Sequence, residues 1–278
     1  MKVECLVATM NQEAQHTPAL LERMNIQTDA VAINQCGRVS YDTFAFRGRT
    51  VRVISTAERG VGRSRNRALA AAEGDICLFS DDDVTYVDGY ADQLLAAFAA
   101  HPEADVLTFN MASRGVERHR KEIRRPGRVR WYSYMRYATN RLAVRRARVE
   151  AAGICFSEHF GGGCRYGSGE DTIFLHDCLK RGLKIYAVPI CLGETDDTSS
   201  TWFGGYDEKF FFDKGALFGA IYGCPGLIFC AAFVLRHRVF FQGERPLKRT
   251  HAFTRMCMGM REYLREYGAE ETRGGKRR

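Results

Sequence analysis

The sequence lacks the signatures of several protein classes. Its ten cysteines form no Cys-x-x-Cys pair, which excludes the commonest zinc-binding pattern. It contains no low-complexity tract and no internal repeat. The first residues, MKVECLVATMNQEAQ, carry a charge at Glu4 and lack the long apolar run of a signal peptide. We therefore expect a cytoplasmic globular protein whose cysteines stay reduced and act mainly as small hydrophobic residues.

Acidic residues are scarce in one long segment. The chain has 278 residues and a formal net charge of +8, and residues 114–148 hold many arginines and few acids. Such a segment forms either a solvated face or a surface for an anionic ligand: a phosphate-bearing substrate, a membrane or a nucleic acid. A nucleic-acid-binding protein is the weaker hypothesis, because the sequence has no zinc, RNA-reading or helix-turn-helix motif.

Short apolar runs alternate with amphipathic stretches in the first half of the chain. The pattern predicts strands over 3–9, 30–35, 51–56, 75–80 and 105–110, with helices over 17–26, 62–74 and 90–101. This alternation is typical of an α/β fold with a mainly parallel sheet flanked by helices. Ligands of such sheets bind at the carboxyl ends of the strands, where helix N-termini also point.

Three consecutive aspartates, Asp81, Asp82 and Asp83, follow the predicted strand 75–80 and therefore lie at that edge. One aspartate is a common helix cap, but three together repel one another unless something positive lies among them. Oxygen ligands favour a hard cation such as Mn²⁺ or Mg²⁺, and an ion held by one or two carboxylates takes phosphate oxygens as further ligands. The aspartates therefore predict a metal-bound nucleotide diphosphate.

Two glycine-rich stretches also carry functional candidates. ERGVGRSRN, residues 58–66, stands between a strand and a helix, where Arg63 and Arg65 can cradle a phosphate. FGGGCRYGSGED, residues 160–171, places five glycines directly before two acids at a predicted helix start. Its glycines, Gly167 and Gly169 among them, allow close backbone approach to an acceptor. We expect the helix N-terminus to hold the pKa of Asp171 low. The alternative for either stretch is a plain surface loop.

These motifs, in this order, resemble the family 2 glycosyltransferases, which are inverting enzymes of the GT-A fold that use nucleotide-activated sugars. The resemblance covers about the first 210 residues: the glycine- and arginine-rich helix start, the Asp-x-Asp after the fourth strand and the Glu-Asp at a helix start. The layout also looks like that of bacterial enzymes of surface-polysaccharide synthesis. The resemblance implies transfer of a sugar, most often from a UDP-sugar, to a glycan or lipid-linked acceptor.

The resemblance also assigns roles. It implies that Asp83 and Asp81 bind the metal, with Asp81 nearer the ribose, and that Asp171 is the catalytic base beside Glu170. The nucleotide-sugar candidates are Thr9, Asn11, Asn34, Gln35, Arg59, Arg63, Arg65, Asn66, Asp81 and Asp82. The acceptor candidates are Gly167, Gly169 and Trp202.

Two positions depart from the family pattern. The second strand ends in INQC instead of an aspartate that recognises the base, so Asn34 or Gln35 must serve. The family's metal-binding histidine after the Glu-Asp is missing from CLGETDDTSS, where Glu194 or Asp196 replaces it or the site lacks that ligand. A sugar nucleotidyltransferase is the alternative enzyme, but ATMNQEAQ after the first strand contains no glycine for a phosphate loop.

The C-terminal region has a different character. Residues 215–235 carry no charge, yet Gly223, Pro225 and Gly226 interrupt them midway. A buried helical hairpin, an interfacial anchor and a membrane span remain open, and aromatic residues before the run and arginines after it favour peripheral membrane contact. We expect a GT-A domain over 1–205, with a nucleotide-binding half to about 110 and an acceptor-binding half from about 111, and a helical region over 206–278.

Overall fold

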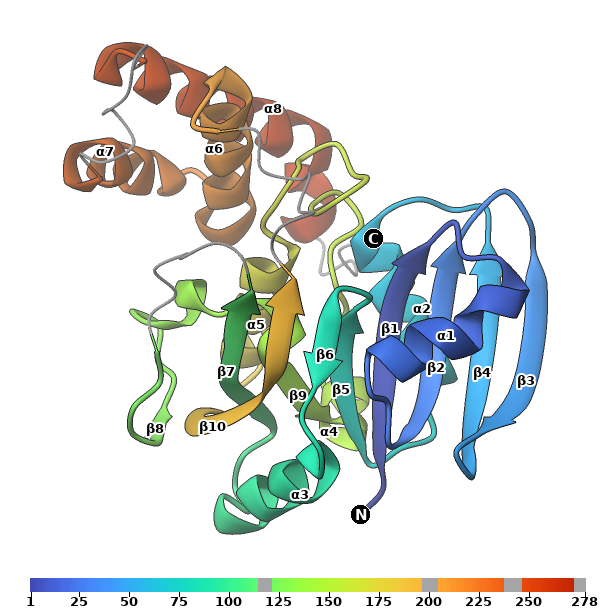
Figure 1. The fold of residues 1–278 in the computed structure, drawn as a ribbon. Coiled ribbons are helices and arrows are strands. Elements are labelled where there is room, and N and C mark those ends of the chain that lie inside the picture. The colour runs from blue at the N-terminus through green and yellow to red at the C-terminus, as the bar shows by residue number, and fades with distance from the viewer. Residues whose placement is uncertain (115–121, 197–204, 238–246, 273–278) are drawn as a thin grey trace.

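The computed structural model describes residues 1–114, 122–196, 205–237 and 247–272. A single sheet runs through the molecule, with helices on both of its faces and three further helices above one edge (Figure 1). The strands are β1 Val3–Met10, β2 Asp29–Gln35, β3 Ser40–Phe46, β4 Arg49–Thr56, β5 Ile76–Asp81, β6 Val84–Tyr86, β7 Val106–Arg114, β8 Gly127–Arg128, β9 Leu142–Arg145 and β10 Ile185–Asp196. The α-helices are α1 Thr17–Arg23, α2 Val61–Ala71, α3 Tyr90–Ala100, α4 Arg146–Ala151, α5 Glu170–Lys180, α6 Glu208–Tyr222, α7 Gly226–Arg236 and α8 Arg249–Thr272.

The sheet is mixed, with a parallel core. Its strands lie in the order β3-β4-β2-β1-β5-β9-β7-β10-β6, and β8 pairs with β10. The neighbours β4, β2, β1 and β5 are mutually parallel, as are β7 and β10. The strands β3, β6 and β9 pair antiparallel and were not expected. They are short or, in β3, largely exposed, so their sequences lack the long apolar runs that identify the core strands.

Register brings polar side chains to one edge of the parallel core. Thr9 on β1 lies opposite Asn34 on β2, which lies opposite Ser55 on β4. On the other side of β1, Ala8 lies opposite Asp81, the last residue of β5. Because these strands are parallel, their carboxyl ends form a single edge, as the alternation of strands and helices predicted.

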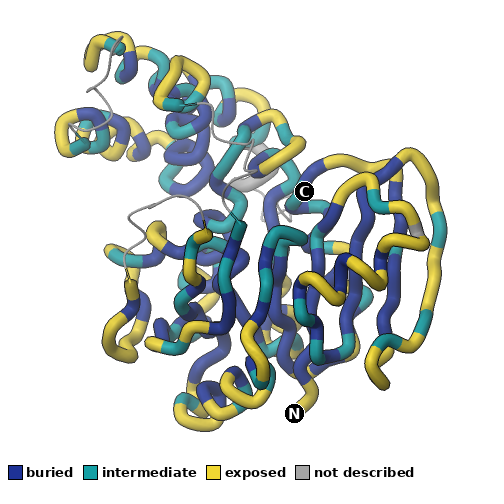
Figure 2. The backbone as a smooth tube through the Cα atoms, viewed as in Figure 1, coloured by how far each residue is buried: buried dark blue, intermediate teal, exposed yellow. Residues whose placement is uncertain are grey.

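Each face of the sheet has its own apolar core. Alternate residues of β1, such as Cys5 and Val7, pack with α1 and α3, where Leu21 and Phe98 are fully buried. The intervening Leu6 packs on the other face with α2, α4 and α5. Side chains of a strand point alternately to opposite faces, so a strand covered on both sides is apolar throughout. Figure 2 shows the buried strands between more exposed helices.

The uncharged run 215–235 folds as two helices. The helix α6 ends at Tyr222, Gly223 has a φ of 63°, and Pro225 stands directly before α7. The helix α6 is mostly buried, and a Cβ at its Gly215 would lie 1.9 Å from the Met256 carbonyl oxygen of α8. The two helix backbones therefore touch. None of the helices in the described part of the chain has the length and apolar character that crossing a membrane requires.

Candidate functional site

The acidic residues at the end of β5 form the first corner of the candidate site. The buried Thr9 donates its hydroxyl to the Asp82 carboxylate at 2.5 Å, which ties β1 to the aspartates. Burial raises the pKa of Asp82, the neighbouring Asp81 raises it further, and the Thr9 hydrogen bond opposes both effects. Asp83 accepts a backbone hydrogen bond at 3.0 Å from Asp196, at the end of β10. We call residues 81–83 the donor corner.

Arg65 connects this corner with the second pair of acids. Its guanidinium donates to Asp81 at 2.9 Å and to Glu170 at 2.8 Å, and its side chain is 6% exposed. Burial acts to lower the pKa of Arg65, but the two carboxylates outweigh it and raise that pKa. A buried guanidinium therefore lies beside Asp81 and also reaches the start of α5.

Glu170 and Asp171 open α5 and form the second corner, which we call the acceptor corner. Glu170 accepts from the backbone N–H of Gly169 at 3.1 Å, and Asp171 accepts from the backbone N–H of Thr172 at 2.6 Å. The prediction of a low pKa for Asp171 is wrong. Burial and repulsion by Glu170 raise the pKa of Asp171 to about 6, against the opposing effects of the Thr172 N–H, Arg65 and Lys214. Desolvation and a like charge thus outweigh the helix N-terminus.

Close contacts in the loop before α5 leave no room for a side chain at one of its glycines. A Cβ at Gly161, whose φ is 99°, would lie 2.5 Å from Val61 and 2.8 Å from the Glu170 carboxylate. The backbone N–H of Val61, at the start of α2, donates to the Gly162 carbonyl at 2.9 Å. The two glycine-rich stretches of the sequence therefore pack against each other, and this packing brings Arg65 to Glu170.

The amides at the end of β2 hydrogen-bond with main chain. Asn34 accepts from the backbone N–H of Gln12 at 3.0 Å and donates to its carbonyl at 2.8 Å. Gln35 donates to the carbonyl of Gly60 at 2.9 Å. Arg59 donates to the carbonyl of Gln35 at 2.9 Å and to the Asn11 side chain at 3.3 Å. These contacts bring together four nucleotide-binding candidates: Asn11, Asn34, Gln35 and Arg59. They order the loops at the carboxyl ends of the parallel strands.

Two further candidates on α2 contact the segment before the glycine-rich loop. Arg63 pairs with Glu158 at 3.0 Å. Asn66 donates to the carbonyl of Phe156 at 2.9 Å and accepts from its N–H at 2.7 Å. Asn66 therefore ties α2 to this segment, a contact that its position in the sequence did not suggest.

The donor set of the corner fits a hard cation only in part. Asp81, Asp82 and Asp83 offer oxygen ligands alone, which suits Mg²⁺ or Mn²⁺. Within the described residues, no three His, Cys, Asp or Glu side chains converge as a metal-binding group. Of the two substitutes for the missing histidine, Glu194 pairs with Arg114, whereas Asp196 lies beside Asp83.

Of the three acceptor candidates, Gly167 and Gly169 lie in the described structure and Trp202 does not. The backbone N–H of Gly167 donates to Asp213 of α6 at 2.8 Å, and a Cβ at Gly169 would lie 2.9 Å from Leu217 of the same helix. Both glycines thus contact the C-terminal helices. Trp202 lies outside the described residues.

Most arginines that the structure describes within residues 114–148 are exposed, but three of them also connect parts of the fold. The buried Arg141 donates to the carbonyl of Phe109 at 2.7 Å, Arg145 donates to the carbonyl of Ala104 at 2.8 Å, and Arg148 pairs with Asp105 at 2.7 Å. Residues 115–121 lie outside the described part of the chain. Arg141, Arg145 and Arg148 therefore join the β9–α4 region to the segments around β7, and most of the other described arginines of the segment stay exposed.

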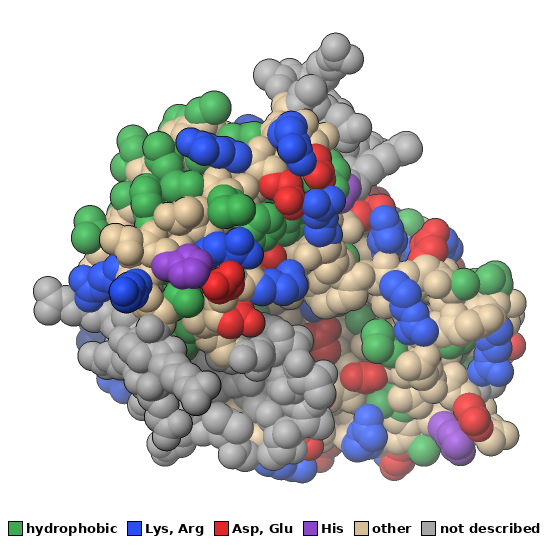
Figure 3. Space-filling view, turned by 90° about the horizontal axis from the view of Figure 1, so that it is seen from above, with side chains coloured by type: hydrophobic (Ala, Val, Ile, Leu, Met, Phe, Trp, Pro, Cys, Tyr) green, Lys and Arg blue, Asp and Glu red, His purple; other side chains and the backbone are tan. Residues whose placement is uncertain are grey.

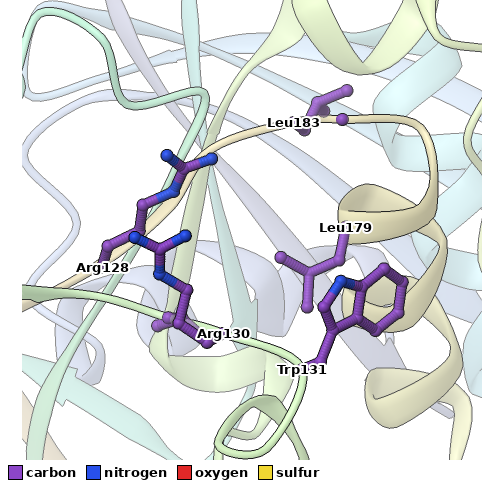
Figure 4. Close-up of a pocket in the computed structure, with 7 residues that line it drawn as sticks. Arg128, Arg130, Trp131, Leu179 and Leu183 are labelled. Atoms are coloured by element: carbon purple, nitrogen blue, oxygen red, sulfur yellow. The ribbon is translucent and has the colours of Figure 1, made fainter.

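A small cavity of about 90 Å³ lies elsewhere on the molecule (Figure 4). Arg128 and Arg130 line it on one side, and Trp131 lies beside Leu179 on the other, with Leu183 also in the lining. Leu179 stands near the end of α5, whereas the acceptor corner stands at its start. The cavity is therefore separate from the two acidic corners.

Three charged residues around the glycine-rich loop had no signal in the sequence patterns: Glu158, Asp213 and Lys214. Asp213 and Lys214 lie on α6, and only an i,i+4 pair of Lys209 with Asp213 marks that helix face as special. Burial lowers the pKa of Lys214, while the negative charges of Asp171 and Asp213 oppose this shift. Tertiary contact alone brings α6 to the loop.

Two comparisons with known proteins found a likeness, one to a family model and one to solved structures. Residues 37–157 match the family model described as glycosyl transferase family 2; the matched segment holds Arg65 and the donor corner and ends before the acceptor corner. No curated protein matches the sequence significantly.

Among solved structures, the chain is similar to S. aureus TarS 1–349, with a TM-score of 0.55 and 18% identity over 99% of this chain and 74% of that chain. The structure of TarS 1–349 in complex with UDP-GlcNAc gives a TM-score of 0.56 and 19% identity over 99% of this chain and 75% of that one. At this level of identity the likeness concerns the fold. Residues 37–157 therefore match the model of glycosyl transferase family 2, and the chain shares the GT-A-like fold of TarS 1–349.

Proposed function

We propose that the protein transfers a sugar from a nucleotide-diphosphate sugar to a hydroxyl of a glycan or lipid-linked acceptor, with inversion, in polysaccharide synthesis. The observation that carries this proposal is the pair of hydrogen bonds from Arg65 to Asp81 and Glu170. One buried guanidinium brings an acid of the strand edge and an acid of the α5 start into a single site. A UDP-sugar is the donor we favour, because the structurally similar TarS has been crystallised with UDP and with UDP-GlcNAc.

The donor corner is proposed to hold the diphosphate. Asp83 and Asp81 would hold a Mn²⁺ or Mg²⁺ ion, whose chemistry when bound is to stabilise the charge that develops on the leaving diphosphate. Thr9 holds Asp82 in place. The loops around Asn11, Asn34, Gln35 and Arg59 would receive the nucleoside, and Arg63 and Asn66 fix the start of α2 whose N-terminus faces that edge.

Asp171 is proposed as the general base. A carboxylate takes the proton of an attacking hydroxyl only in its ionised form, and a raised pKa makes it a stronger base. With a pKa of about 6, Asp171 is mostly ionised at pH 7 and is more basic than an ordinary aspartate. Glu170 is held by Arg65 and by the Gly169 N–H, so it positions the start of α5. One displacement with the base and the diphosphate on opposite sides of the sugar would invert the anomeric carbon.

A nucleotide-sugar panel tests the proposal. We expect a UDP-sugar to raise the melting temperature of the protein in the presence of Mn²⁺ and to lose most of this effect with EDTA. The variant Asp83→Ala should bind the nucleotide sugar equally weakly with and without Mn²⁺. Its matched control is Asp88→Ala, which changes an aspartate of the same segment that pairs with Asn25 and Gln27 away from the corner. No metal-dependent shift with any nucleotide sugar would contradict the donor assignment.

We also propose that the outward face of α7 rests on an anionic lipid surface. Leu227, Ile228 and Leu235 are 44%, 71% and 68% exposed, and exposed Arg236 and Lys248 flank them. Figure 3 shows hydrophobic side chains gathered on the side of the C-terminal helices, with basic side chains nearby. Residues 215–235 carry no charge, and the charged residues that border this run, Lys214 and Arg236, are both basic. Basic side chains beside an apolar face complement anionic lipid headgroups. If two copies of the chain paired through this face of α7, their basic residues would repel one another, so a lipid surface is the better partner.

Vesicle binding tests this contact. The full chain should sediment with vesicles that contain phosphatidylglycerol at low salt, and the double variant Ile228→Glu with Leu235→Glu should stay in the supernatant. The control Val87→Glu places the same charge at a residue that is 39% exposed, between β6 and α3. A wild-type chain that ignores anionic vesicles, or that self-associates through α7, would contradict the proposal.

A further inference from the structure

We infer that α6 and α8 clamp the acceptor loop, residues 159–169, and that Asp213 is the positioning residue that sets the place of the Glu170–Asp171 pair. This inference rests on the proposed function and deepens it. It adds a role for the C-terminal helices, which the resemblance to family 2 does not cover.

The first contact is between α6 and the loop. Asp213 is 6% exposed, and it accepts from the Gly167 N–H at 2.8 Å and from Lys209 at 2.7 Å. Lys209 also donates to the Arg165 carbonyl at 3.1 Å. A buried carboxylate without partners is costly, so Asp213 and its two donors form a unit whose geometry is fixed. Through it, α6 holds the loop backbone a few residues before Glu170.

The second contact is between α8 and the loop. Arg165 pairs with Glu262 at 2.9 Å and with Glu266 at 2.8 Å. The ring of His159 lies 4.0 Å from that of Tyr267, and the ring of Phe160 lies 5.5 Å from that of Tyr263. The loop is thus held from its first residue by one helix and near its end by the other.

The third contact is between α6 and α8 themselves, which pack so closely that they form a rigid pair. A Cβ at Gly259 of α8 would lie 2.0 Å from the Phe212 carbonyl oxygen, just as one at Gly215 of α6 would overlap α8. Small residues allow helix backbones to touch, and such close packing leaves little room for one helix to slide on the other. A shift of α6 would therefore be carried to the loop and to the acids that follow it.

The position of Asp171 depends on where α6 and α8 hold the loop. The charged groups that face it are Glu170 on its own helix, Arg65 on α2 and Lys214 on α6. Loosening Gly167 would move Asp171 relative to a hydroxyl that it must meet within hydrogen-bond reach, and a misplacement of about 1 Å costs on the order of 10²-fold in rate. The nucleotide side of the site would not move.

The test compares three variants of the full chain. Asp213→Ala should lower kcat for sugar transfer by about 10- to 100-fold and leave KM for the nucleotide sugar within about threefold. Asp213→Asn keeps an oxygen that accepts from Gly167 and should restore kcat to within about threefold of wild type. Glu208→Gln is the matched control, because Glu208 pairs α6 with His251 and Arg255 of α8 and does not contact the loop.

Hydrogen exchange separates this inference from the proposed function. In Asp213→Ala, amides of residues 166–172 should exchange faster while those of residues 1–56 stay unchanged, whether or not any transfer is observed. The inference is overturned by unchanged exchange in that loop, by a kcat of Asp213→Ala within about twofold of wild type, by Asp213→Asn as slow as Asp213→Ala, or by an equal loss in Glu208→Gln.

Discussion

The donor corner and the acceptor corner are both acidic, yet they are built in different ways. Asp81–Asp83 stand at the end of a strand whose neighbours are fixed by sheet register, and Thr9 of the adjoining strand holds Asp82 directly. Glu170 and Asp171 stand at the end of a glycine-rich loop that depends on contacts from α2, α6 and α8. The first corner is therefore part of the sheet, and the second is assembled from remote segments.

The difference shows in the electrostatics as well. In the donor corner, burial and Asp81 also raise the pKa of Asp82, but the Thr9 hydroxyl and the Arg65 guanidinium hydrogen-bond with the acids. In the acceptor corner, Asp171 is desolvated beside a like charge, and its pKa rises to about 6. A group that holds a cation needs its charge at every working pH, whereas a group that accepts a proton benefits from a pKa near the working pH. The two environments are consistent with the metal-binding and base roles proposed above.

The largest effect should come from removing the base. We expect Asp171→Asn to lower kcat about 10³-fold, because an amide cannot accept the proton, and to leave the affinity for the nucleotide sugar unchanged. Steady-state transfer and donor titration measure the two quantities. Asp92→Asn, an exposed aspartate in the first turn of α3, is the control. Normal turnover of Asp171→Asn would remove the functional distinction between the corners.

The next largest effect should come from separating the corners. Arg65→Lys keeps the charge but cannot donate to Asp81 and Glu170 at once, so we expect kcat to fall about 10²-fold. Arg67→Lys on the same helix, whose partner is the exposed Glu58, should behave as wild type. If Arg65→Lys is as active as Arg67→Lys, the two corners work independently.

The pH dependence should follow the acceptor corner. Because the base must be ionised, kcat should fall about tenfold per pH unit below a pKa of about 6 and level off above it. Glu170→Gln removes a negative neighbour, which favours the ionised form of Asp171, so the acid limb of the profile should move to lower pH. A limb that stays in place, or that moves to higher pH, would contradict the assigned cause of the shift.

The smallest effect should come from the donor corner. Thr9→Val removes the hydroxyl that Asp82 accepts from, which raises the pKa of Asp82 further and frees its carboxylate to move. The loss of one such hydrogen bond, about 1 kcal/mol, predicts roughly fivefold weaker donor binding. Thr9→Ser keeps the hydroxyl and should bind like wild type. Equal affinities of all three proteins in donor titrations would show that Thr9 has no part in holding this corner.

The sequence predicted the parallel core well because each core strand is a continuous apolar run. The runs ending at Thr9, Gln35 and Ser80 correspond to β1, β2 and β5. The strands β6 and β9 escaped prediction because they are short and pair antiparallel with partners far along the chain. The low pKa predicted for Asp171 was wrong because a helix N-terminus is visible in sequence, whereas desolvation by packed neighbours is not.

The order of residues along the chain by itself determined which chemistry is available and at which edge: acids directly after a buried strand, and acids directly after glycines at a helix start. Only the tertiary structure decided that Arg65 joins these two sets and that Asp213 of α6 reaches Gly167. Local pattern controls strand, turn and helix start because those depend on near neighbours. Contacts between distant segments depend on how whole helices pack, and no local pattern encodes that.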